Sequence, residues 1–137
     1  MIAIASAILR DTDGKYLLVQ EKKESVHGLW GLPGGWADEA ESLRQAAIRE
    51  TKEEVGLEIE IDGDLPIYDL DKPELDRHFY AFLGTIKSGE VTIDNSELLA
   101  AQWYSFDDIK SLYTQARLRS PWAMAAIERA ENAYSRD

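Results

Sequence analysis

The N-terminal part of the chain consists of apolar segments separated by a short polar turn. Residues 1–10 are apolar and contain several isoleucines, and residues 16–22 form a second apolar segment. Between them, residues 11–14 read Asp-Thr-Asp-Gly, and an Asp-Gly pair between apolar segments is a strong hairpin signal. The pattern therefore predicts two strands joined by a hairpin turn.

A glycine-rich loop and a helix follow these strands. Residues 24–40 contain four glycines and a proline, which prevent any regular helix there. Ser42 and Gln45 have the spacing of a capping box, the next residues continue helically, and Gly56 is placed to end the helix. We therefore predict a helix between Ser42 and Gly56, entered directly from the glycine-rich loop.

The rest of the chain combines short strands with two further helices. The predicted strands occupy residues 57–61, 65–70, 77–86, 91–93 and 101–104. One helix opens at residues 105–108, and Ser120-Pro121 caps and starts another that runs towards Tyr134. The order of elements indicates an α+β fold with a mixed sheet between helices. A length of 137 residues suits one domain over residues 1–137.

Composition and charge exclude several classes of protein. The chain lacks cysteine, which rules out disulfides, thiolate catalysis and Cys-ligated zinc. Its formal charge of −11 repels phosphates, so polymeric nucleic acid is not an expected ligand. The apolar residues 1–9 are too few to span a bilayer and follow no basic leader, so we expect no membrane association and a cytoplasmic location. Some of the carboxylates serve solubility; others are candidates for holding divalent cations.

Three glutamates of the predicted helix are the strongest candidates for such a role. At about 100° per residue, Glu50, Glu53 and Glu54 fall within one arc of about 100°, whereas Thr51 and Val55 face elsewhere and can join the core. Three like charges weaken a helix. Pairing with Arg49 and binding of hard cations such as Mg²⁺ or Mn²⁺, which prefer oxygen ligands, are two ways to offset them. A solvated acidic face is the alternative interpretation.

The residues around this helix resemble the signature of a known family. Glycine, glutamate, arginine and apolar residues recur at the spacing of the Nudix box of MutT-like hydrolases. The matching positions are Gly35, Glu41, Arg49, Glu50, Glu53, Glu54, Gly56 and Leu57. Thr51 departs from the box, which has an aliphatic residue there. Residues 30–35 and 95–109 also resemble family segments. The resemblance implies a Nudix-type α/β/α sandwich and Mg²⁺-dependent hydrolysis of a small nucleoside diphosphate-linked molecule.

The resemblance also implies roles for individual residues. Glu50 and Glu54 would be the main Mg²⁺ ligands, with Mn²⁺ as a substitute and the carbonyl of Gly34 as a backbone ligand. Glu53 would be a further ligand or the general base, and Arg49 would orient it. Glu41 and Gly35 would lie next to these ligands and help to position them without binding the cation. Glu97 is the other candidate base, and an ordinary loop acid is its alternative role.

The substrate is less clearly indicated. Lys22 and Lys23 end a predicted strand where the family often places a basic residue near phosphates, and alternation turns only one of them inward. Trp30, Trp36 and Phe79 or Tyr80 are candidates for stacking on a base. Arg119 precedes a helix start and could bind phosphate.

Two segments of the chain point to different substrates. Residues 117–121 resemble a branch that acts on nucleoside di- and triphosphates, whereas residues 35–38 resemble ADP-ribose-type members. The family also contains homodimers. A nucleotide-binding sensor without turnover, and an acidic face that docks a partner, are the alternatives to an enzyme.

Overall fold

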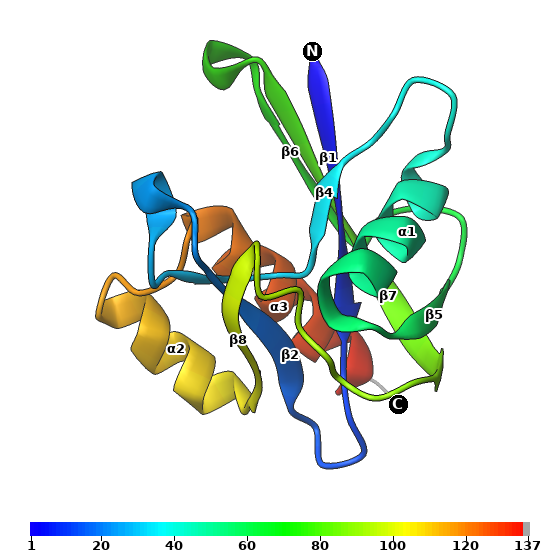
Figure 1. Cartoon of the computed structure of the whole chain (residues 1–137). Coiled ribbons are helices and arrows are strands. Elements are labelled where there is room, and N and C mark those ends of the chain that lie inside the picture. Colours follow the sequence, from blue (N-terminus) through cyan, green and yellow to red (C-terminus); the bar gives the residue numbers. More distant parts are fainter. Residues whose placement is uncertain (136–137) are drawn as a thin grey trace.

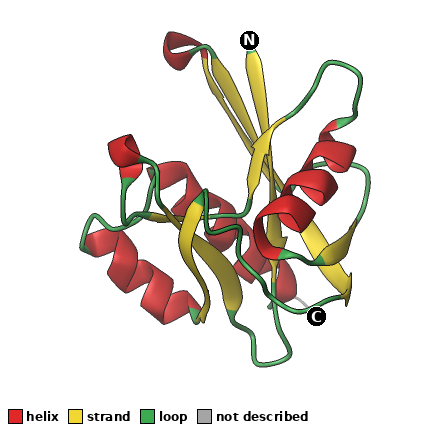
Figure 2. Ribbon diagram, in the orientation of Figure 1, coloured by secondary structure: helices red, strands yellow, loops and turns green. Residues whose placement is uncertain are grey.

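Two β-sheets lie between helices in the computed structural model, which describes residues 1–135 (Figure 1). The elements are β1 (Ile2–Leu9), β2 (Tyr16–Glu21), the 3₁₀ turn η1 (Glu24–Val26), β3 (Trp30–Gly31), β4 (Gly34–Trp36), α1 (Leu43–Val55), β5 (Glu58–Ile61), β6 (Tyr68–Lys72), the 3₁₀ turn η2 (Pro73–Leu75), β7 (Arg77–Ser88), β8 (Leu98–Tyr104), α2 (Phe106–Thr114) and α3 (Pro121–Tyr134). Figure 2 shows how the loops connect them. None of the helices in residues 1–135 is long and apolar enough to cross a bilayer.

The larger sheet is mixed and the smaller one is antiparallel. In the larger sheet the order is β4-β1-β7-β5, with β6 also paired to β7, and β1 runs parallel to β7. The smaller sheet has the order β3-β2-β8. Helix α1 packs on one side of these sheets, whereas α2 and α3 lie on the other, with one apolar core beneath each side. The predicted α+β fold, with helices on both sides of a mixed sheet, is confirmed.

The first two strands are buried on both faces. Leu17 and Val19 of β2 join the core under α1, whereas Tyr16 and Leu18 join the core under α2 and α3. A strand covered on both faces needs apolar residues at every position, which explains the continuous apolar runs in the sequence.

The hairpin predicted for these strands is wrong. The turn is present, and Gly14 adopts a φ of 80°, but β1 and β2 enter different sheets. Only the isolated bridge between Arg10 and Tyr16 joins their ends. The two strands diverge because each is buried on both faces and pairs with strands from later in the sequence.

Helix α1 begins and ends where the local sequence predicts. The side chain of Ser42 accepts from the Gln45 N–H, and the Gln45 side chain bonds back to the Ser42 N–H. Gly56 ends the helix in the left-handed region, at a φ of 73°, which glycine adopts without strain. Thr51 and Val55 are fully buried, as the helical arc predicts.

The segment 91–93 is not a strand, contrary to the prediction. It lies against the end of α1, where the Thr92 N–H donates to the Val55 carbonyl (2.9 Å) and the Asp94 N–H donates to the Glu54 carbonyl (3.0 Å). The last carbonyls of a helix have no partner within the helix. This segment therefore satisfies a helix end rather than a sheet edge, although its side-chain pattern is that of a strand.

Other boundaries shift by a few residues. β6 begins at Tyr68 instead of residue 65, and β8 begins at Leu98 instead of residue 101. The predicted loop 24–40 contains the short strands β3 and β4. Glycine-rich sequence has little intrinsic preference for strands, so here pairing with β1 and β2 determines the backbone.

Candidate active site

Two glycines of β4 allow the strand to lie against both β1 and α1. A Cβ atom at Gly34 would lie 2.4 Å from the carbonyl oxygen of Ala5, and one at Gly35 would lie 2.5 Å from the Cδ of Glu50. At Gly34 the backbone of β1 leaves no room for a side chain, whereas a side chain at Gly35 would have to displace the Glu50 carboxylate. The glycines therefore bring the backbone of β4 into direct contact with the carboxylates of α1.

Glu54 is a buried carboxylate at this contact. It is 7% exposed, and its Oε1 accepts the Gly34 N–H at 2.7 Å. Burial raises the pKa of Glu54 to about 8, against the lowering effect of the Gly34 hydrogen bond. The charges of Glu50, Glu21 and Glu97 raise this pKa further. Glu54 therefore lies where a positive charge would be strongly stabilised.

Glu50 lies next to Gly35, one turn before Glu54. Its side chain is 19% exposed, and burial raises the pKa of Glu50, an effect that Arg49 opposes. Glu53 is more exposed, at 56%, and faces the same opening. The three glutamates therefore form one wall, but with decreasing burial from Glu54 to Glu53.

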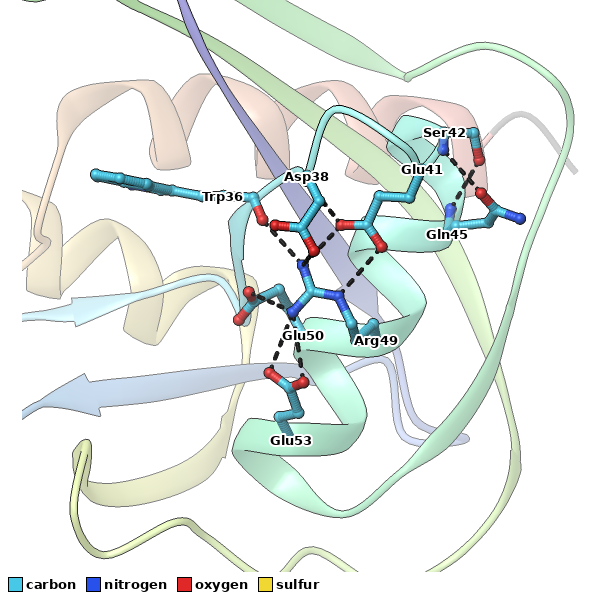
Figure 3. A network of polar contacts seen from close by, with 8 residues as sticks. All are labelled: Trp36, Asp38, Glu41, Ser42, Gln45, Arg49, Glu50 and Glu53. Carbon is cyan, nitrogen blue, oxygen red and sulfur yellow. Dashed lines mark hydrogen bonds and ion pairs between the residues drawn. The ribbon is translucent and has the colours of Figure 1, made fainter.

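Arg49 is the centre of the polar network on this wall (Figure 3). Its guanidinium donates twice to Glu41, at 2.7 and 3.1 Å, and once to Glu50 at 3.0 Å. It also donates to the carbonyl of Trp36 at 3.0 Å. The predicted pair with Glu53 is present but longer, at 3.3 Å. Arg49 thus links the segment before α1 to the glutamates by hydrogen bonds, and Glu41 is its closest partner.

A cavity of about 920 Å³ opens in front of the glutamate wall. One end is acidic, and its carboxylates come from three separate segments. They are Glu21, Glu50, Glu53, Glu54, Asp94 and Glu97. The other end is largely apolar and includes Trp36, Phe79 and Trp122. Lys23, Arg77 and Arg119 are the basic residues in its lining. The cavity can therefore hold a molecule with one charged and one apolar part.

The structure separates the two predicted lysines. Lys23 lines the cavity, whereas the Lys22 ammonium donates to the carbonyl of Asn95 at 2.9 Å and is not part of the lining. Arg119 also lines the cavity and pairs with Glu21 at 2.8 Å. Glu97 also lines the cavity. Of the two lysines, only Lys23 therefore lines the cavity, and its contact with a substrate stays a prediction.

The expectation that Trp30 stacks on a base is corrected. Trp30 is only 4% exposed and packs edge-on against Tyr104, with ring centroids 5.0 Å apart. It belongs to the core because β3 pairs with β2 and turns the indole inward. Trp36, by contrast, is 57% exposed at the cavity, and the Arg77 guanidinium lies 5.3 Å from its ring centroid.

Several lining residues were missed by the sequence analysis. Glu21, Arg77, Asp94 and Trp122 come from four segments far apart in the chain. Arg77 could have been found, because it is two residues from Phe79 on the same strand and shares its face. The other three have no local signal, since only the packing of the sheets brings them to one cavity.

Comparison with known proteins identifies the family of this chain. The family model described as the NUDIX domain matches residues 2–124. The chain belongs to the Nudix family. A Nudix relative from Caenorhabditis elegans with the provisional name nudix hydrolase 1 is 35% identical over 118 residues, which cover 84% of this chain and 32% of the relative.

Solved Nudix structures agree with the observed fold. A NUDIX hydrolase from Nitrosomonas europaea has a TM-score of 0.79 at 26% identity, covering 96% of this chain and 89% of that one. An ADP-ribose pyrophosphatase from Streptococcus suis has a TM-score of 0.65 at 35% identity, covering 78% and 75%. The chain spans less than two thirds of the length of the curated Nudix relatives that it matches first.

Proposed function

We propose that this Nudix protein uses Mg²⁺ to hydrolyse the phosphoanhydride bond of a small nucleotide-linked diphosphate. The observation that supports this most directly is the cavity, because it joins a wall of glutamates to an aromatic end. A diphosphate would lie at the acidic end only together with cations. A base or another planar group would lie against Trp36 and Phe79.

The residues present are suited to hold Mg²⁺. Glu54 is buried, and the charges that act most strongly on it are other carboxylates, so its ionisation is unfavourable unless a cation lies beside it. Its donors are carboxylate oxygens, as Mg²⁺ prefers. Glu50 and Glu54 would be the main ligands, with Glu53 and the carbonyl of Gly34 as further candidates. Within residues 1–135 no group of three or more acidic or histidine side chains is placed to hold a metal ion by itself. The backbone carbonyl and the waters that Mg²⁺ usually keeps would have to complete its coordination.

The proposed reaction is attack of water on one phosphorus of the diphosphate. A bond forms from the water oxygen to phosphorus, the bridging P–O bond breaks, and the water proton passes to a carboxylate. Bound Mg²⁺ would neutralise charge on the phosphate oxygens and acidify water. Arg49 holds the glutamates in place, and Lys23 and Arg119 lie where they can attract phosphate oxygens.

Glu97 is better placed than Glu53 to act as the base. Both oxygens of Glu53 lie within 3.4 Å of the Arg49 guanidinium and are already engaged by hydrogen bonds from it. Glu97 lines the cavity, and its charge acts on both Glu50 and Glu54. We therefore assign proton removal to Glu97 and metal binding to Glu53.

An ADP-ribose-like substrate is favoured by the aromatic end. Trp36 of β4 lies opposite Ile4 of β1, and Ile4 lies opposite Phe79 of β7. The three side chains therefore share one face of the sheet. Phe79 contacts Trp122 of α3, with centroids 5.1 Å apart. The Streptococcus suis relative is named as an ADP-ribose pyrophosphatase, in agreement with this surface. A simple acidic docking face would not need a buried Glu54.

The first prediction concerns metal-dependent turnover. With a panel of ADP-ribose, nucleoside triphosphates, CDP-alcohols and dinucleoside polyphosphates, we expect hydrolysis of at least one compound, faster by at least about 10²-fold with Mg²⁺ than with chelator. Released mononucleotide or phosphate is measured by chromatography. Tight nucleotide binding without turnover would instead support the sensor function, and neither binding nor turnover would contradict the proposal.

The second prediction separates the base from the metal ligand. Glu97→Gln is expected to lower kcat by about 10²-fold because the water proton loses its acceptor. Glu53→Gln lowers kcat comparably at low Mg²⁺, but raising the Mg²⁺ concentration restores much of the activity, since only affinity for the cation is reduced. Steady-state kinetics over a range of Mg²⁺ concentrations measures both effects. Rescue of Glu97→Gln by Mg²⁺ would reverse the two assignments.

A further inference from the structure

The loop 89–97 carries Glu97 to the cavity and is fixed at its first part to α1. The Thr92 and Asp94 N–H groups donate to the carbonyls of Val55 and Glu54, at 2.9 and 3.0 Å. These contacts set the loop against the helix that carries the glutamates. The position of Glu97 therefore depends on how the remaining residues, from 94 to 97, are held.

Asp94 organises this remaining part as a tight turn. Its Oδ1 accepts the Ser96 N–H at 3.0 Å and the Ser96 hydroxyl at 2.6 Å. Its carbonyl accepts the N–H groups of Glu97 and Leu98, at 3.0 and 2.9 Å. An aspartate that bonds the backbone two residues later is typical of such turns. These bonds define the shape of the turn, whose two ends are held by the Asp94 N–H, which donates to α1, and by the buried Leu98 of β8, and they leave the tip at Asn95 to be held by another contact.

Lys22 connects the turn to the end of β2. Its N–H donates to the carbonyl of Glu97 at 3.2 Å, and its ammonium donates to the carbonyl of Asn95 at 2.9 Å. The two bonds reach peptides on both sides of the turn. Hydrogen bonds from a charged donor are stronger than those between neutral groups. The side chain of Lys22 thus holds the tip of the turn, while its backbone holds the base.

We propose that Lys22 is a positioning residue that fixes the orientation of the Glu97 turn, and that it does not bind substrate phosphate. The inference rests on the proposed function in one respect, that Glu97 removes the proton from water. Lys22 and Lys23 therefore have different roles although they are adjacent and chemically identical. Lys23 lines the cavity and attracts phosphate, whereas Lys22 acts through the loop.

A double-mutant cycle tests this division of roles. Lys22→Met keeps the length of the side chain and removes the charge. On the substrate that the panel identifies, it is expected to lower kcat about 10-fold with KM within about twofold, because a misplaced base reduces turnover rather than binding. In the Glu97→Gln background the same change has no further effect beyond about twofold, since the residue through which it acts is already lost.

The neighbouring lysine is the matched comparison. Lys23→Met is expected to raise KM about 10-fold with little change in kcat, and to do so equally in the Glu97→Gln background. Lys22→Arg restores most of the lost kcat because a long cationic side chain can still reach the Asn95 carbonyl. A large increase in KM for Lys22→Met that also appears in the Glu97→Gln background would overturn the proposal.

Hydrogen exchange gives a second readout that does not require activity. In Lys22→Met, the Ser96 and Glu97 amides are expected to exchange about 10-fold faster, whereas Lys110→Met on α2 leaves them unchanged. Faster exchange in a protein that hydrolyses nothing would contradict the proposed function and retain the inference about Lys22. Unchanged exchange of these amides would overturn the inference, whatever the activity.

Discussion

Glu54→Gln is expected to lower kcat by about 10³-fold and, at the same time, to raise the melting temperature of the metal-free protein at pH 9. The amide keeps the oxygen that accepts the Gly34 N–H, so the local geometry is retained. What is lost is the negative charge that would hold Mg²⁺ in a buried position. The same charge is unfavourable in the metal-free protein because burial opposes ionisation.

The pH dependence follows from the raised pKa of Glu54. The group has an ordinary pKa of 4.5 and a pKa of about 8 in the folded protein, so the folded state binds the proton more tightly. This contribution to stability is complete below pH 4.5 and is lost as the pH rises through 8. Metal-free Glu54→Gln should therefore exceed the wild type in melting temperature by several degrees at pH 9, and the difference should vanish near pH 4.5.

Three measurements check this prediction. Calorimetry reports Mg²⁺ binding, thermal unfolding with chelator reports stability, and steady-state kinetics reports turnover. Glu60→Gln on β5 is a suitable control, because that side chain is 63% exposed and lies outside the cavity lining. Near-normal turnover of Glu54→Gln, or undiminished Mg²⁺ binding, would remove Glu54 from the proposed metal site.

Gly35→Ala is the second change with a large expected effect, a fall in kcat of about 10³-fold. The new Cβ would lie 2.5 Å from Cδ and 2.6 and 2.8 Å from the oxygens of Glu50, so the carboxylate or the strand must move. Displacement of Glu50 removes one proposed ligand. It also disturbs the Glu50–Arg49 hydrogen bond on the same wall. Removal of one preorganised charged group typically costs 10²–10³ in rate, and here two interactions change together.

Gly31→Ala provides the matched control for this substitution. A Cβ at Gly31 would lie 3.6 Å from the Cβ of Arg119, an ordinary contact, and the position lines the same cavity. We expect its kcat to stay within about threefold of the wild type. In a Glu50→Gln background, Gly35→Ala should cost much less than it does alone, because the displaced ligand is already lost. Equal losses for the two glycine variants would show that the clash with Glu50 is not the cause.

Local sequence determined the part of the site that lies on one helix. The spacing of Glu50, Glu53 and Glu54 predicts that they share one face of the helix. The hydrogen bonds at Ser42 and Gly56 show that both ends of the helix were predicted correctly. Helical geometry depends on residues three or four positions apart, so a short stretch of sequence contains the needed information. The prediction that Arg49 pairs with Glu53 was also correct, although Glu41 holds Arg49 more closely.

The strands were less predictable because their partners come from distant parts of the chain. Residues 91–93 have the side chains of a strand, but their N–H groups bond to the end of α1. Trp30 has the appearance of a stacking residue, but pairing of β3 with β2 buries it. The predicted single domain over residues 1–137, the cytoplasmic location and the homodimer stay predictions.

By itself, the sequence thus determined the α+β class, the Nudix box and the grouping of its glutamates on one helical face. Only the tertiary structure decided which of Lys22 and Lys23 faces the cavity, and that Glu21, Arg77 and Trp122 share it. The physical reason is range: a cap or a helical face depends on neighbours within one turn. A cavity between two sheets depends on pairings across the whole chain, which no local pattern records.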